Sequence, residues 1–329
     1  MSGFTPPARE RGAALLAVLV LVAFMGAIAA VAFERLRLST ALAINHASIE
    51  QGRAYAVGVE TLLAMRAGDL VSQSRDITTL AGDWNGTERR IPLPGEGLAV
   101  GTIRDAGNCF NLNSLVQGEP PARLSTRPQA VEQFTNLMLV LGVPERDARG
   151  VAAAAADWVD SDGDAAPAGA EDAAYAGFAV AYRPANTLFA ETSELRAVAG
   201  VTPALYQLVR PYVCALPTNE LSPINVNTLL PRDAPLLAMF APGRTGLEEA
   251  RGIIARRPAA GWKEMAEFNR ATGPNELPLD PSSQLQLNSR WFALDLRIEY
   301  NGAELIETAL VDARYTPARV VVRRWGRDE

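Results

Sequence analysis

The strongest hydrophobic pattern in the chain is an uninterrupted apolar run close to its start. Residues 13–33 contain no charged residue and no proline. A helix of this length rises about 32 Å, which is enough to cross a bilayer's hydrocarbon core of about 30 Å. The run therefore predicts a membrane-spanning helix that carries the remaining residues on one side.

Two other interpretations of this run remain open at the level of sequence. The triplet Ala30-Val31-Ala32 has the small-x-small form of a signal-peptidase site, so the run could belong to a cleaved secretory signal. The apolar region of such a signal is normally about 7–15 residues, and this run is longer. A plain single-pass anchor is the other alternative. The arginines on the two sides of the span balance, so they do not determine its orientation.

Beyond the span the pattern changes to that of an amphipathic helix. Leu38, Leu42, Ile49, Ala56 and Leu63 are spaced at intervals of 4 and 7 residues. No proline occurs between positions 8 and 91, so a single helix over residues 13–65 is predicted, about 80 Å long. Half of it would lie in the membrane or a helical bundle, and half would pack on the following domain.

The remaining chain is predicted to be α+β, with strands on either side of a largely helical region. Strands are predicted over 97–105, 289–300, 303–313 and 319–325, and Asn301-Gly302 predicts a tight hairpin turn. Helical patterns occupy 129–141, 145–159 and 247–256, and Thr192 or Ser193 is predicted to cap a further helix.

Composition and charge narrow the function. The formal net charge is −6, so no global basic field favours nucleic acid. One histidine, no Gly-x-Ser-x-Gly motif and no phosphate-binding loop argue against an enzyme. The two cysteines, Cys109 and Cys214, permit one disulfide in an oxidising compartment, or remain two separate buried thiols.

The most chemically distinctive stretch is the acidic loop, defined here as residues 160–172. Asp160, Asp162, Asp164 and Glu171 occupy relative positions 1, 3, 5 and 12, the acidic spacing of an EF-hand loop. The glycine expected at position 6 is absent, so a nonstandard calcium site is predicted, with Asp172 as a further candidate ligand. A solvated acidic loop without metal is the alternative.

Two segments resemble helix–hairpin–helix units, around residues 192–213 and 224–268. Such units in DNA-uptake proteins present backbone N–H groups to phosphate, which makes a membrane-tethered DNA receptor the alternative function. The first unit has few basic residues and the whole chain is acidic, so no nucleic-acid partner is expected.

The chain start resembles the type IV pilin and type II secretion pseudopilin signal. A short charged leader ends in Gly12, and the apolar helix begins at Ala13. The resemblance implies cleavage between these residues by a prepilin peptidase, followed by methylation of the new amino terminus. Most members carry glutamate at the fifth mature position, which is Ala17 here. The K-type minor pseudopilins are similar in lacking it and in their large size.

This resemblance implies a function, a location and partners. A K-type minor pseudopilin would sit in the bacterial inner membrane as a single-pass protein with a large periplasmic domain. It would act at the tip of the type II secretion pseudopilus, with the I- and J-type minor pseudopilins and other pseudopilus subunits as partners. On the inner-membrane secretion platform it would help to initiate pseudopilus assembly and the export of folded proteins. The family is also described as binding calcium in its helical region, which supports the ligand set predicted above.

The resemblance also implies a pseudopilin fold, in which the long helix packs on an antiparallel sheet that is interrupted by a large all-α insertion with helix–hairpin–helix or SAM-like units. The expected divisions are a leader (1–12), a transmembrane helix (13–33), the helix continuation with the first strands (34–110), a helical insertion with the acidic loop (111–219), a second SAM-like unit (220–283) and the C-terminal strands (284–329).

Overall fold

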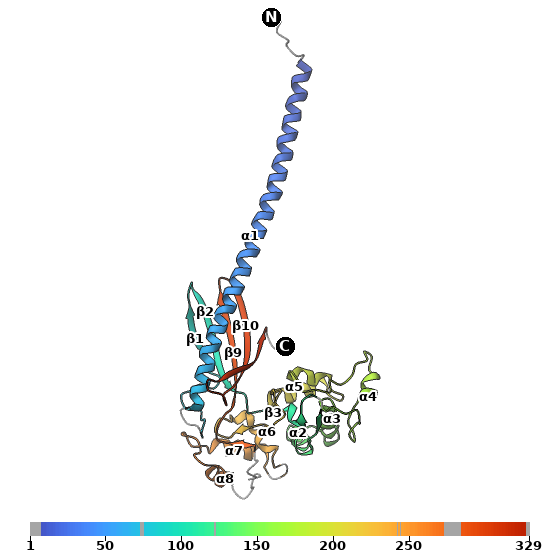
Figure 1. Cartoon of the computed structure of the whole chain (residues 1–329), viewed down its shortest axis with the longest axis vertical. Helices are drawn as coiled ribbons and strands as arrows, with labels where there is room; N and C mark the ends of the chain where they lie inside the picture. The colour runs from blue at the N-terminus through green and yellow to red at the C-terminus, as the bar shows by residue number, and fades with distance from the viewer. Residues whose placement is uncertain are drawn as a thin grey trace.

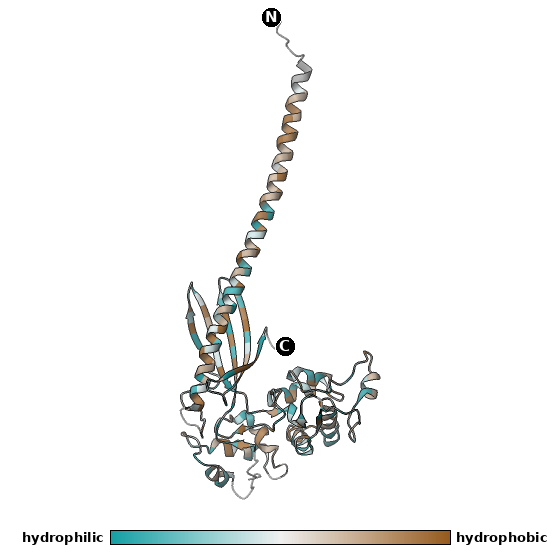
Figure 2. Cartoon of the chain, in the orientation of Figure 1, coloured by the Kyte–Doolittle hydropathy of each residue, from teal (hydrophilic) through white to brown (hydrophobic). Residues whose placement is uncertain are grey.

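A single long helix, α1 (Ala8–Ser72), forms a stalk that projects from the folded part of the chain (Figure 1). The computed structural model describes residues 8–72, 76–121, 123–241, 243, 245–272 and 284–326. Residues 12–47 of α1 are exposed, and Ser48 is its first buried residue. Figure 2 shows that apolar residues dominate the exposed half. The helix is longer than predicted at both ends, because no proline or capping signal stops it.

The membrane-distal half of α1 lies on a five-stranded antiparallel sheet. The strand order is β1-β2-β9-β10-β11, so the strands near the C-terminus complete a sheet begun near residue 90. Asn301 and Gly302 have φ values of 47° and 80°, as a two-residue hairpin turn requires. The strands are β1 (Arg89–Leu93), β2 (Gly97–Asp105), β9 (Trp291–Tyr300), β10 (Ala303–Asp312) and β11 (Arg319–Trp325).

One face of this sheet is buried beneath α1. Ala56 and Leu63 of the predicted helical stripe pack with Leu294 and Ile298 in one hydrophobic cluster. Gly101 permits the close approach, because a Cβ there would lie 2.7 Å from Cδ1 of Leu63. Burying one such leucine stabilises the fold by about 1.5–3 kcal/mol. Residues on the opposite sheet face are half-buried or exposed, except for the buried cross-strand pair Trp291 and Asp312 at one end.

A group of three ionisable side chains, Glu60, Glu307 and Arg323, lies between α1 and the sheet. Glu60 is 2% exposed and accepts hydrogen bonds of 2.7 and 2.6 Å from Arg323. Glu307 is fully buried, with Arg323 at 3.4 Å. Burial raises the pKa of Glu307 to about 8, and the Glu60 charge adds to this effect. Although burial opposes ionisation of Glu60, the hydrogen bonds from Arg323 lower its pKa.

The residues between β2 and β9 form a mostly helical insertion with its own hydrophobic core. Its first part contains β3 (Phe110–Asn111), η1 (Leu112–Leu115), β4 (Val116–Glu119), β5 (Arg123–Thr126), α2 (Pro128–Val140), α3 (Glu145–Asp157), α4 (Asp172–Ala176), η2 (Thr192–Ala197), α5 (Pro203–Val209), η3 (Arg210–Tyr212) and β6 (Val213–Cys214). Its second part contains β7 (Ile224–Asn225), η4 (Pro231–Asp233), α6 (Ala234–Ala238), α7 (Leu247–Ala255), α8 (Met265–Thr272) and β8 (Leu285–Gln286).

Each part begins with the same short motif, FNLNSL at 110–115 and INVNTL at 224–229. In each motif, the side-chain oxygen of the first asparagine accepts a hydrogen bond from the backbone N–H of the second asparagine. The first asparagine and the residue before it form a short parallel β-pair with a later segment of the same part. The second asparagine, Asn113 or Asn227, is fully buried and bonds both backbone groups of a distant residue, Phe189 or Trp262. The motif therefore ties each part of the insertion together at its centre.

Two details of the insertion differ from the sequence prediction. The predicted cap at Thr192 or Ser193 is wrong. Glu191 is the N-cap of a 3₁₀ helix, in a capping box with Glu194. Helix α3 ends two residues early at Asp157, because its carboxylate turns to bind the following loop. The structure settles the open question of the cysteines: Cys109 and Cys214 form a disulfide.

Candidate metal centre

The acidic loop is held in place by a buried aspartate at the end of α3. The Asp157 carboxylate accepts backbone N–H groups from Ala166, at 3.1 Å, and Ala170, at 2.8 Å. Gly169 makes this possible, since a Cβ at that position would lie 2.0 Å from Oδ2 of Asp157. The loop conformation is thus determined by one carboxylate and one glycine.

Two more buried carboxylates lie at the ends of the acidic loop. Asp160 is 3% exposed, and its Oδ2 accepts the Thr126 hydroxyl at 2.9 Å. Glu171 is 7% exposed and comes immediately before α4. Oδ1 of Asp160 and Oε1 of Glu171 are buried and have no hydrogen-bond donor among the described residues. Buried polar atoms are normally paired, so these two oxygens indicate a group that the protein residues alone do not supply.

The structure brings together three of the five predicted ligands. Carboxylate oxygens of Asp160, Asp162 and Glu171 lie within 4.8 Å of one another. Asp162 is exposed and also accepts the backbone N–H of Asp164 at 3.0 Å. Asp164 and Asp172 lie outside this trio, and Asp172 faces Arg183 at 3.5 Å.

The electrostatics of the trio favour a cation. The pKa of Asp160 is raised to about 6, mainly by burial and also by the charges of Asp162 and Asp157, against the lowering effect of the Thr126 hydrogen bond. The pKa of Glu171 is raised to about 7, mainly by burial and then by the charges of Asp160, Asp157 and Asp162. Close carboxylates repel one another unless protons or a cation neutralise them. Clustered carboxylate oxygens are the ligands of hard divalent ions, so this cluster could hold a metal.

Sequence reasoning missed the residues that support the trio. Thr126 lies 34 residues before Asp160, and no local pattern connects the two. Asp157 precedes the acidic loop and is not among the predicted ligands, although its hydrogen bonds with backbone N–H groups shape the loop. Two acidic residues on either side of a glycine-containing loop are the only local signal for that role.

The predicted processing site lies on the exposed part of α1. Gly12 and Ala13 are both helical and exposed. Residues 1–7 of the predicted leader lie outside the described residues. One helix in the described part of the chain, beginning at Gly12, is long and apolar enough to span a membrane.

A long apolar helix on an antiparallel sheet, with a large helical insertion, is the architecture expected of a pseudopilin. Comparisons with known proteins specify the type. Two family models described as type II secretion system (T2SS), protein K match residues 108–218 and 224–288. The chain is 36% identical to type II secretion system protein K of Pectobacterium carotovorum subsp. carotovorum and 35% identical to that of Klebsiella pneumoniae. Each comparison covers 97% of both chains.

A solved structure is similar over most of the chain. A chain in the crystal structure of the GspK–GspI–GspJ complex of enterotoxigenic Escherichia coli matches with a TM-score of 0.71 and 30% identity, over 85% of this chain and 97% of that one. This chain belongs to the type II secretion system protein K family, the K-type minor pseudopilins. The family has a structural role, as predicted from the lack of an enzyme constellation, and the assignment displaces the DNA-receptor alternative.

Proposed function

We propose that this chain is a single-pass inner-membrane protein whose periplasmic domain caps the pseudopilus together with the I- and J-type minor pseudopilins. In that position it would help to initiate pseudopilus assembly on the secretion platform and the export of folded proteins. The observation that carries this proposal is the similarity to a chain of the GspK–GspI–GspJ complex, which covers 85% of this chain.

The shape and chemistry of the chain support a place at the tip. The insertion lies at the end of the molecule opposite the free half of α1 (Figure 1). Bulk at that end hinders another subunit from packing above, while the exposed apolar side chains of α1 remain available for neighbouring helices. Ala17 offers no carboxylate to a neighbour's terminal amine, yet the Ala13 amine can still be offered to the subunit below.

The number of copies in assembled pseudopili tests this location. A subunit confined to the tip gives one copy per filament, whatever the filament length. Purified pseudopili sorted by length, with quantitative immunoblotting for this chain and the major subunit, should show a constant number per filament. A number that rises in proportion to length would place the chain in the shaft and contradict the proposal.

Helix packing with the I- and J-type partners can be tested separately. Leu42 is 60% exposed on α1, beyond the apolar run. Leu42→Arg should abolish co-purification of the ternary complex, because it places a charge on the helix face offered to partners. Val180→Arg is a matched control on the insertion, where Val180 is 79% exposed. Retention of the complex by the Leu42 variant would contradict this packing.

Processing at Gly12 and Ala13 is part of the proposal. The support is the position of both residues at the start of an exposed apolar helix. The mass of the membrane-extracted chain should correspond to a methylated amino terminus at Ala13, produced by a prepilin peptidase. An intact chain from Met1 would indicate a plain anchor, and a chain starting at Phe33 would indicate a cleaved secretory signal.

We propose further that the metal of the acidic loop is calcium. Asp160, Asp162 and Glu171 would be the core ligands, with Asp164 and Asp172 completing the shell predicted from sequence. The two unpaired buried oxygens support this choice, because calcium takes six to eight oxygen ligands. A bound ion neutralises the mutual repulsion of the carboxylates and stabilises the folded loop.

Thermal unfolding of the full chain in detergent, with calcium or with a chelator, tests the metal. At a calcium concentration of about 100 Kd the stabilisation is about 2.7 kcal/mol. Glu171→Gln should remove most of it. Asp147→Asn, which changes an exposed acid on α3, should retain it. Unfolding curves that are identical with calcium and with chelator would contradict the site.

The division of the chain is also proposed, with the boundaries predicted from sequence and with two SAM-like units in the insertion. The repeated motif at 110–115 and 224–229 supports two related units. Both would serve protein contacts. Limited proteolysis should cleave first near 217–223, between the units, and protected fragments with other boundaries would contradict the division.

A further inference from the structure

A cleft separates the open face of the sheet from the insertion, away from the acidic loop. Its volume is about 900 Å³. One wall is the sheet face opposite α1, formed by two cross-strand rows. Arg104, Ala293, Leu310 and Val322 make the first row, and Thr102, Asp295, Thr308 and Arg324 make the second. The other wall comes from η2, α5 and η3 of the insertion.

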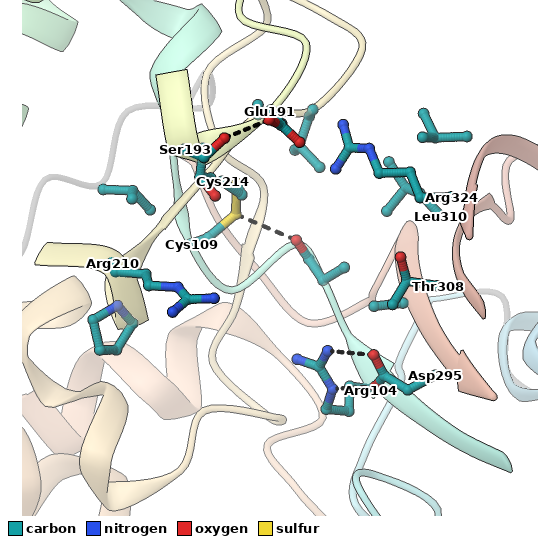
Figure 3. A pocket seen from close by; sticks show the side chains of 18 of the residues that line it. Arg104, Cys109, Glu191, Ser193, Arg210, Cys214, Asp295, Thr308, Leu310 and Arg324 are labelled. Atoms are coloured by element: carbon teal, nitrogen blue, oxygen red, sulfur yellow. Dashed lines mark hydrogen bonds and ion pairs between the residues drawn. A yellow bond between two sulfur atoms is a disulfide. The ribbon is translucent and has the colours of Figure 1, made fainter. Parts of the chain in front are cut away.

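The two walls of this cleft are connected at fixed points. The Cys109–Cys214 disulfide lies between them (Figure 3), and Arg324 of β11 donates a hydrogen bond to the backbone carbonyl of Ala190. A site that is already formed binds its ligand without a further cost of ordering. The cleft is therefore suited to hold a segment of another molecule.

The acidic side chains in the cleft already have partners. Asp295 accepts hydrogen bonds of 2.8 and 3.1 Å from Arg104 and another of 3.1 Å from Thr102. Glu191 accepts the Ser193 hydroxyl and caps η2. Arg104 therefore neutralises Asp295, and Glu191 is engaged in the cap of η2.

Arg210 is different, because it is oriented toward the cleft without a partner. Arg210 is half-buried on η3, and its guanidinium makes no hydrogen bond or ion pair with the residues that the structure describes. Figure 3 shows its guanidinium pointing into the cavity. Arg196 lines the same wall, 5.9 Å from the ring centroid of Tyr206. In a chain of net charge −6, the cleft thus offers a local positive site.

We propose that this cleft binds an acidic peptide segment of a partner protein, with a carboxylate on the Arg210 guanidinium. A guanidinium matches a carboxylate with two parallel hydrogen bonds. Apolar Leu310, Val322 and Pro211 line the same cleft, so the segment carries apolar side chains beside its acidic ones. The inference is independent of calcium binding and of the position in the pseudopilus.

The test measures binding of a fluorescein-labelled peptide, ELEVEL, to the full chain in detergent, with QLQVQL as the uncharged counterpart. Arg210→Gln should weaken ELEVEL binding by about tenfold or more. On the unaltered chain, QLQVQL should bind more weakly than ELEVEL by about the same factor. Arg270→Gln removes an exposed arginine on α8 and should leave binding unchanged. Thr308→Trp, which fills the cleft from the sheet wall, should abolish binding without altering any charge.

Several results would overturn the proposal. ELEVEL could fail to bind at concentrations up to about 1 mM. Arg270→Gln could weaken binding as much as Arg210→Gln, which would indicate a diffuse charge effect. Inorganic phosphate could displace the peptide at equal concentration, which would indicate a general anion site. Circular dichroism of each variant checks that it is folded. If Arg210→Gln misfolds, the Thr308→Trp variant still provides a test. Unchanged ELEVEL binding by a folded Thr308→Trp chain would show that the cleft is not the binding site.

Discussion

Substitution of Asn113 by alanine should destabilise the insertion more than its small change in volume suggests. The Asn113 amide donates to the carbonyls of Phe189, at 3.0 Å, and Leu216, at 2.8 Å. Its Oδ1 accepts the Phe189 N–H at 2.7 Å. Since the side chain is fully buried, alanine leaves the N–H and the carbonyl of Phe189 without partners and out of reach of water, while the Leu216 carbonyl keeps only its bond from the Thr218 N–H.

The magnitude follows from the two Phe189 groups that lose their partners and from the lost bond to Leu216. Each unsatisfied buried group costs about 1–3 kcal/mol, and local relaxation recovers part of the sum. We therefore expect Asn113→Ala to lower the free energy of unfolding by about 3–5 kcal/mol. For a domain of this size the unfolding temperature should fall by about 6–20 °C. Asn227→Ala should cost less, because Asn227 makes only two of the corresponding bonds, both with Trp262.

Urea and thermal unfolding of the full chain in detergent, followed by tryptophan fluorescence, would measure these effects. Asn219→Ala is the matched control, because Asn219 makes one exposed hydrogen bond with its side chain, to Gly118. Its cost should stay below about 1 kcal/mol. If Asn113→Ala is no more destabilising than this control, the buried amide does not hold the insertion together and the reasoning is wrong.

Two further substitutions test the acidic loop and the helix–sheet interface. Gly169→Ala places a Cβ against the Asp157 carboxylate, so the loop should lose a hydrogen bond to a charged group. Thermal melts should show a loss of stability of about 1.5–3 kcal/mol. Gly163→Ala is the control, because a Cβ at Gly163 meets open space and should leave the stability unchanged. Folded Glu307, with its pKa raised from 4.5 to about 8, holds a proton that the unfolded chain releases above 4.5. The free energy of unfolding should therefore fall as pH rises from about 5 to about 8, and Glu307→Gln should flatten the curve; an unchanged slope would argue against a buried neutral Glu307.

The sheet and most helices were predictable because their patterns are local. The predicted strand 319–325 matches β11 at both ends, and burial alternates along its seven residues. The predicted helix 129–141 differs from α2 by one residue at each end, and Pro128 at its first position marks the start. Residues that share one face of a strand or helix recur at a fixed spacing in the sequence, so burial of that face can be predicted from the sequence.

The supporting contacts were not predictable, because they join distant segments. Thr126 reaches Asp160 across 34 residues, and Asn113 reaches Phe189 across 76. The cap at Glu191 was missed because threonine and serine are the more frequent capping residues at that point. Likewise, the wall of the cleft that carries Arg210 meets the sheet only after the insertion folds.

The exposed half of α1 determines the distance between the apolar run and the folded part of the chain. Residues 34–47 are helical, exposed and outside the apolar run, so they add about 21 Å of rigid spacer. With the apolar run in the hydrocarbon core of a bilayer, the headgroup layer takes up about 5–7 Å of this height, so the sheet and insertion stand clear of the headgroups by about 15 Å. The gap is wide enough for helices of neighbouring subunits to reach the spacer from the side, and any shortening of it would press the folded part against the membrane surface.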